Sequence, residues 1–85
     1  MTQMIAHYAV DDFATFKKKF DDDAENRGNA GMSTLQLWRE NTNSAWALFQ
    51  IADAGATRAY LDGNAAVFNS LAGVTALEYH FVETV

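Results

Sequence analysis

The stretch QMIAHYAVDDFATFKKKF, residues 3–20, places a strand pattern directly before a helix pattern. Apolar side chains alternate along residues 3–10, which is the two-residue period of a strand with one buried face. Asp11 or Asp12 can then cap a helix by accepting the free N–H groups of its first turn. Apolar side chains next recur at three- and four-residue spacing, on one side of a helix: Phe13, Phe16, Phe20 and Ala24. A strand that leads into an amphipathic helix predicts a layered domain of sheet and helices.

The rest of the chain continues this alternation of strand and helix patterns. We expect the first helix to end near Arg27 and Gly28, strands over residues 31–40, 45–52 and 75–85, and a second helix over residues 54–71. Polar residues 41–44 predict a hairpin turn, and Asp62-Gly63-Asn64 predicts a kink or a restart of the second helix with Asp62 as its cap. The order β-α-β-β-α-β predicts one ferredoxin-like α+β domain over residues 1–85, a four-stranded antiparallel sheet with both helices on one face.

Composition restricts the class of protein and its partners. The chain is 49% hydrophobic and 20% charged, as folded domains are. Six basic residues against 11 acidic ones give a net charge of -5, which disfavours nucleic acid and anionic membranes as partners. The absence of cysteine excludes a thiol nucleophile and a Cys-ligated metal. Because no apolar run could cross a bilayer and no leader pattern precedes the first strand, we expect a cytoplasmic protein.

The alternation also separates two faces of the sheet. One face is apolar enough to lie under the helices: Met4, Ala6, Tyr8, Val10, Leu35, Leu37, Ala47, Phe49, Ile51, Leu77, Tyr79 and Phe81. The opposite face collects Ile5, His7, Gln36, Trp38, Trp46, Leu48, Gln50, Glu78, His80 and Val82. No helix remains to cover this second face, and a soluble monomer rarely exposes such a patch. The pattern therefore predicts a homodimer that forms through the open face of the sheet.

Two histidines on the second face are the candidate catalytic residues. His7 and His80 can carry protons near neutral pH, and Glu78 could orient or polarise one of them. The alternative is that both rings only fill space and form hydrogen bonds across the dimer interface. No further acidic or imidazole ligand accompanies them, so we expect no metal site.

The same face offers candidate ligand-binding residues. Trp38 and Trp46 could stack on a planar aromatic ligand, or they could only pack the interface. Gln36 and Gln50 could donate hydrogen bonds to a ligand oxygen, or they could satisfy each other. Arg27 is expected to complement the dipole at the end of the first helix and to pair with the acidic run there. No phosphate loop or nucleotide fingerprint is present, so no cofactor is expected.

Several short motifs, in order and spacing, resemble one family. They are His7 late in the first strand, Asp11-Asp12-Phe13, Phe16, Phe20-Asp21, Arg27 with Ala30-Gly31, Asp53, and Ala72-Gly73-Val74. The chain resembles the small members of the dimeric α/β-barrel superfamily that are grouped with antibiotic biosynthesis monooxygenases. The resemblance implies that two ferredoxin-like sheets pack face to face and hold a ligand between them. The catalytic asparagine of the cofactor-free monooxygenases does not align with a strand position of this chain.

These observations predict a dimeric barrel protein that binds a small aromatic or polyketide-like molecule. It would act as a cofactor-independent monooxygenase, isomerase or cyclase, with His7 as base or hydrogen-bond donor and Trp38 as platform. The alternative is a non-catalytic ligand-binding or interaction module whose lumen, the space between the two sheets, is packed by its own side chains. A ligand pocket of roughly 300 Å³ or more that reaches His7 would favour the first reading.

Overall fold

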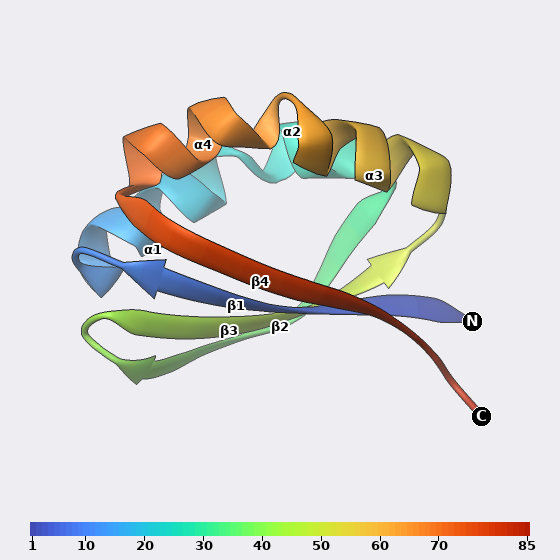
Figure 1. The fold of residues 1–85 in the computed structure, drawn as a ribbon, viewed down its shortest axis with the longest axis horizontal. Helices are drawn as coiled ribbons and strands as arrows, with labels where there is room; N and C mark the ends of the chain where they lie inside the picture. Colours follow the sequence, from blue (N-terminus) through green and yellow to red (C-terminus); the bar gives the residue numbers. More distant parts are fainter.

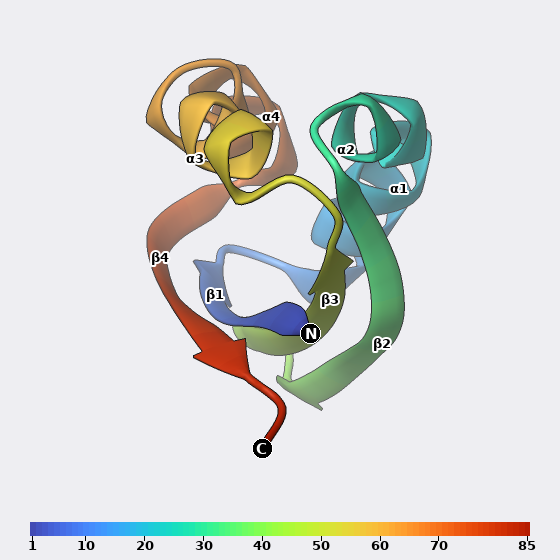
Figure 2. The same ribbon diagram turned by 90° about the vertical axis from the view of Figure 1, so that its right-hand side faces the viewer.

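The computed structural model describes residues 1–85 as one antiparallel sheet with all helices on one of its faces (Figures 1 and 2). The elements are β1 (Thr2–Val10), α1 (Phe13–Asp22), α2 (Ala24–Asn29), β2 (Met32–Asn41), β3 (Ser44–Ile51), α3 (Ala54–Asp62), α4 (Ala65–Ala72) and β4 (Val74–Glu83). The strand order is β2-β3-β1-β4, with every neighbouring pair antiparallel. The predicted ferredoxin-like α+β fold is confirmed. None of the helices combines the length and the apolar character that crossing a membrane requires.

Each of the two predicted helices is divided into two. The break in the second one falls at residues 62–64, as predicted, although Asn64 and not Asp62 precedes α4. The break in the first one, at Asp23, was not predicted. The end of the first helical segment lies near Arg27 and Gly28, as predicted, with α2 ending at Asn29, and the left-handed glycine that follows is Gly31, with a φ of 78°.

Asp12 caps α1, and its loss should be measurable. One carboxylate oxygen accepts hydrogen bonds from the backbone N–H of Thr15 at 3.0 Å and from its hydroxyl at 3.1 Å. Asp12→Ala should lower the free energy of unfolding by about 1 kcal/mol, because it leaves a first-turn N–H without its acceptor. Urea denaturation measures the change, with the exposed Asp11→Ala as the matched control. Equal losses for the two variants would contradict the cap.

The core lies between the helices and the predicted face of the sheet. Met4, Phe16 and Phe49 are fully buried there, and the Tyr8 ring stacks on Phe16 at 4.9 Å between centroids. The predicted core position of Leu35 is wrong, because its side chain is 48% exposed. Thr34 pairs with Phe49 and Gln36 with Leu48, so Leu35 is the extra residue of a β-bulge. A bulge shifts the alternation by one residue, and a period-two pattern cannot anticipate it.

Candidate functional site

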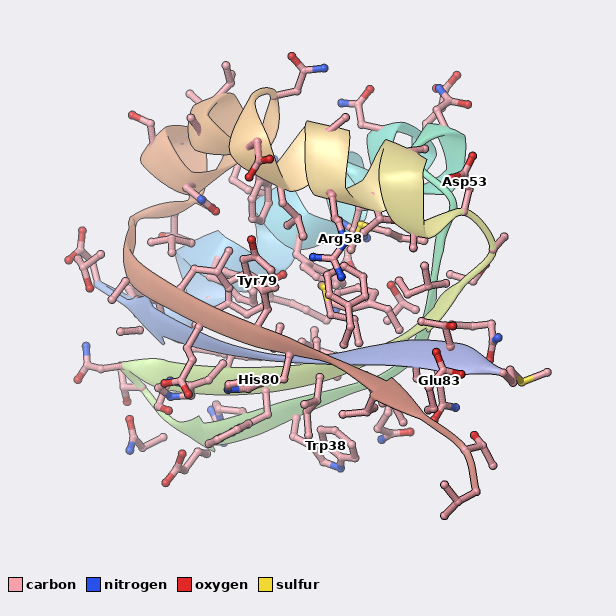
Figure 3. All side chains as sticks on the ribbon, turned by 45° about the vertical axis from the view of Figure 1, so that its right-hand side comes forward. Trp38, Asp53, Arg58, Tyr79, His80 and Glu83 are labelled. Carbon is pink, nitrogen blue, oxygen red and sulfur yellow. The ribbon has the colours of Figure 1, made fainter.

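The sheet face away from the helices, called the outer face below, brings the seven predicted site residues together. Strand register places them in rows that run across all four strands: Trp38–Trp46–His7–Glu78, Gln36–Leu48–Ile5–His80, and Ser33–Gln50–Gln3–Val82. Figure 3 shows Trp38 and His80 on this side, whereas Tyr79 and Arg58 lie between the sheet and the helices. No part of the chain covers the outer face (Figure 2). Trp38 and Trp46 are 44% and 38% exposed on it.

A hydrogen-bonded cluster surrounds His7 at the hairpin end of the outer face. The His7 Nε2 atom lies 2.6 Å from the Ser44 hydroxyl oxygen, and that hydroxyl donates to the Glu40 carboxylate at 2.9 Å. The same Glu40 oxygen accepts the indole N–H of Trp46 at 2.6 Å. The His7 and Trp46 rings are 4.5 Å apart, at an angle of 43°. Glu40 therefore ties together a histidine and a tryptophan that both belong to the predicted site.

The charge of Glu40 can be followed through Trp46. Hydrogen bonds from Trp46 and then from Ser44 hold the pKa of the Glu40 carboxyl below its usual value. The ionised Glu40 carboxylate therefore stabilises the folded protein fully at a pH above the usual carboxyl pKa. This stabilisation is lost as the pH falls through the lowered pKa of the folded state. In an NMR titration, the Trp46 indole N–H signal should shift with a midpoint below the ordinary glutamate value of about 4.3. Trp38, whose indole forms no hydrogen bond, is the internal control, and a midpoint at the ordinary value would contradict the cluster.

The other predicted site residues form no hydrogen bond with this cluster around His7. Glu78 faces His7 across the strand pair, but its carboxylate bonds to the His80 Nε2 atom at 2.8 Å, and both side chains are exposed. No hydrogen bond links His7 with either of them. Gln50 donates to the Thr2 carbonyl at 3.4 Å, not to Gln36. The structure contains no group of three or more acidic or histidine side chains that could hold a metal ion.

The largest hollow of the chain lies on the other side of the sheet, between the helices. It is a groove of about 810 Å³ between the two helix pairs, called the helix groove below. Its 13 lining residues include the apolar Ala59, Val67, Phe68 and Leu71 and the phenol of Tyr60. None of the seven predicted site residues lines this groove or either of the two smaller hollows. The chain by itself therefore forms no hollow beside His7.

Beneath the helix groove is a polar network that the sequence did not indicate. Tyr60 donates its hydroxyl proton to Asp23 at 2.7 Å, and burial, together with this hydrogen bond, raises the pKa of the Tyr60 phenol. Burial also raises the pKa of Tyr8, which lies close by. Arg27 lies in the last turn of α2, as expected, but it is only 6% exposed and forms no ion pair with the acidic run, so the expected pairing is wrong. Arg27 is the buried residue of α2, the short helix that follows the break at Asp23.

Solved structures with this architecture are similar to the chain at low sequence identity. A variant of SnoaB, a cofactor-independent oxygenase from Streptomyces nogalater, matches with a TM-score of 0.73 and 20% identity over 98% of this chain and 91% of that one. The ActVA-Orf6 monooxygenase of Streptomyces coelicolor, in complex with nanaomycin D, matches with a TM-score of 0.66 and 16% identity over 99% and 87%. An antibiotic biosynthesis monooxygenase matches with a TM-score of 0.69 and 10% identity over 100% and 99%.

At the level of sequence, no protein-family model and no curated protein matches the chain. The structural matches nevertheless agree with the resemblance that the sequence motifs indicated. At these identities they establish the shared fold: the chain has the fold of antibiotic biosynthesis monooxygenases.

Proposed function

We propose that the protein is a homodimer whose two outer faces pack together and enclose a lumen that binds a small aromatic or polyketide-like molecule. The observation that carries this proposal is the uncovered row Trp38–Trp46–His7–Glu78, in which two exposed indoles adjoin a histidine. Indole surface left open on a sheet is typical of an interface or of a site for planar ligands. Similar folds in a cofactor-independent oxygenase and in a nanaomycin D complex support a small molecule as the ligand.

The chemistry we propose is cofactor-independent oxygenation, isomerisation or cyclisation. Each can begin with removal of a proton from an acidic aromatic or enolisable ligand, and His7 would accept that proton. Trp38 would support the ring of the ligand, with Trp46 beside it. The remaining predicted residues would take secondary roles: His80 and Glu78 as a second proton-carrying pair, and Gln36 and Gln50 as hydrogen-bond donors to ligand oxygens.

The helix groove favours a second candidate function, in which the protein binds a ligand without acting on it. In this alternative the lumen is packed by its own side chains, and the ligand occupies the groove between the helix pairs. The groove is larger than the roughly 300 Å³ at which ligand pockets begin, and it combines apolar walls with the Tyr60 hydroxyl at its floor. His7 would then have a purely structural role.

A binding experiment separates the two candidates. The wild type, His7→Ala and Ala59→Trp are titrated with a library of naphthols and hydroxyanthraquinones, followed by calorimetry. If the lumen holds the ligand, His7→Ala should weaken binding at least tenfold while its melting temperature and dimer mass stay close to those of the wild type. Ala59→Trp narrows the helix groove without touching the sheet, so it should leave that binding unchanged.

The reverse pattern supports the second candidate. If only Ala59→Trp weakens binding, the ligand lies in the helix groove. If His7→Ala lowers the melting temperature and no library member binds the wild type, His7 is structural and the enzymatic proposal fails. The lost packing against Trp46 and the lost Ser44 contact would then account for the loss of stability.

A further inference from the structure

We infer that Glu40, acting through Ser44, is a positioning residue that keeps the proton of neutral His7 on Nε2 and presents Nδ1 as the proton acceptor of the outer face. The inference rests on the proposed role of His7 and specifies which ring nitrogen takes the proton of the ligand. Neither Glu40 nor Ser44 was among the site residues predicted from the sequence.

The hydrogen count of the cluster fixes the direction of each bond. A serine hydroxyl has one hydrogen to donate, and an ionised carboxylate can only accept. Glu40 is held in its ionised form by two donors, the Trp46 indole and the Ser44 hydroxyl. With its hydrogen directed at Glu40, the Ser44 oxygen can only accept from the ring atom 2.6 Å away, which is His7 Nε2. Nε2 must therefore carry a hydrogen, and in the neutral ring Nδ1 then carries none.

The other ring nitrogen is free to act. Nδ1 of His7 has no hydrogen-bond partner and is not completely buried, so its lone pair is accessible. The other titratable groups on the neighbouring strand do not compete for it, because Glu78 and His80 bond to each other. Trp46 lies against the His7 ring and restricts its rotation. The accessible lone pair is thus held in one orientation by contacts on the opposite edge and on the face of the ring.

This arrangement suits a ligand with a weakly acidic hydroxyl group, such as a phenol or an enol. The O–H bond of the ligand breaks, its hydrogen forms an N–H bond at Nδ1, and the electron pair stays on the ligand oxygen as a phenolate or enolate. His7 becomes an imidazolium that still donates from Nε2 to Ser44. Glu40 lies at the end of the same chain of hydrogen bonds. Its negative charge stabilises the new positive charge on His7 without any further proton transfer.

The tautomer of His7 can be measured in the ligand-free protein by two-bond ¹H–¹⁵N NMR. The chain has two histidines, so the His80→Asn variant identifies the His7 signals. Spectra are recorded at alkaline pH, because the tautomer is a property of the neutral ring. In the wild type, Nδ1 should show the shift of an unprotonated nitrogen and Nε2 that of a protonated one.

Variants of the cluster give opposite expectations. Ser44→Ala should move both shifts toward averaged values, because the two tautomers then interconvert. Glu40→Ala frees the Ser44 hydroxyl to donate to Nε2, so the proton should move to Nδ1. Glu40→Gln keeps an acceptor for Ser44 and should retain the wild-type tautomer, and Glu78→Gln is the matched control on the other side of the ring.

Protonation of Nδ1 in the wild type, or an unchanged tautomer in both Ser44→Ala and Glu40→Ala, would overturn the inference. If Glu40→Ala fails to fold, the wild type and Ser44→Ala still decide it. Because no ligand is present, this result is independent of the binding experiment. A protein that binds no library member, yet shows these tautomers, would refute the proposed function and leave the positioning by Glu40 standing.

Discussion

Leu48→Asp should convert the proposed dimer into a monomer or an unfolded chain. Leu48 lies in the row Gln36–Leu48–Ile5–His80, at the middle of the uncovered face. In the proposed dimer the substitution would place an unpaired carboxylate from each copy in an apolar interface, at a cost of about 4 kcal/mol or more. That cost corresponds to at least about a thousandfold weaker dimer. Sedimentation equilibrium at micromolar concentration measures the change in mass.

Val67→Asp is the matched control for this experiment. Val67 is 65% exposed on α4, on the helical side of the protein, so a carboxylate there remains in water whether or not the sheets pair. We expect its dimer mass and its melting temperature to equal those of the wild type. A wild-type protein that sediments as a monomer, or a Leu48→Asp variant that remains a tight dimer, would refute the closed barrel and with it the lumen.

The strand alternation predicted the outer face because the register of three of its four strands is almost regular. His7, Trp46 and Glu78 fall in one row, as a period of two requires. Glu40 was missed although the alternation that includes Gln36 and Trp38 places it on the same face, because it is the last residue before the expected turn and the alternation alone does not show that its carboxylate reaches Ser44 and Trp46. The pairing of β2 and β3 shifts between Arg39 and Asn41, so the geometry of the hairpin decides which side chains Glu40 contacts.

The position of Arg27 could not be predicted for a different reason. An arginine next to a glycine near the end of a helix is predicted to be exposed to solvent. The acidic residues before it are its expected ion-pair partners. In the structure the helix breaks at Asp23, and the Arg27 guanidinium lies over the Phe20 ring, 3.7 Å from its centroid. Tertiary packing determines the position of Arg27, and the spacing of residues in the sequence does not predict it.

Arg27→Ala should be among the most destabilising single substitutions in the chain. The guanidinium is buried, donates from Nη1 to the Phe20 carbonyl at 2.6 Å, and lies among Tyr8, Asp23 and Tyr60. Truncation removes this packing, leaves a cavity and deprives the network of its only cation, at an expected cost of about 3 kcal/mol. For a domain of this size the melting temperature should fall by roughly 12–24 °C. Differential scanning calorimetry measures the fall.

Two further variants separate packing from charge. Arg58→Ala is the matched arginine control, because Arg58 is exposed and stacks on the Phe81 ring at 4.1 Å. Its loss should cost no more than about 1 kcal/mol. Arg27→Met keeps much of the buried volume without the charge, so a melting temperature close to that of the wild type would assign the stabilisation to packing over Phe20. A fall as large as that of Arg27→Ala would assign it to the charge and its hydrogen bond. Equal, small effects of Arg27→Ala and Arg58→Ala would contradict the buried position of Arg27.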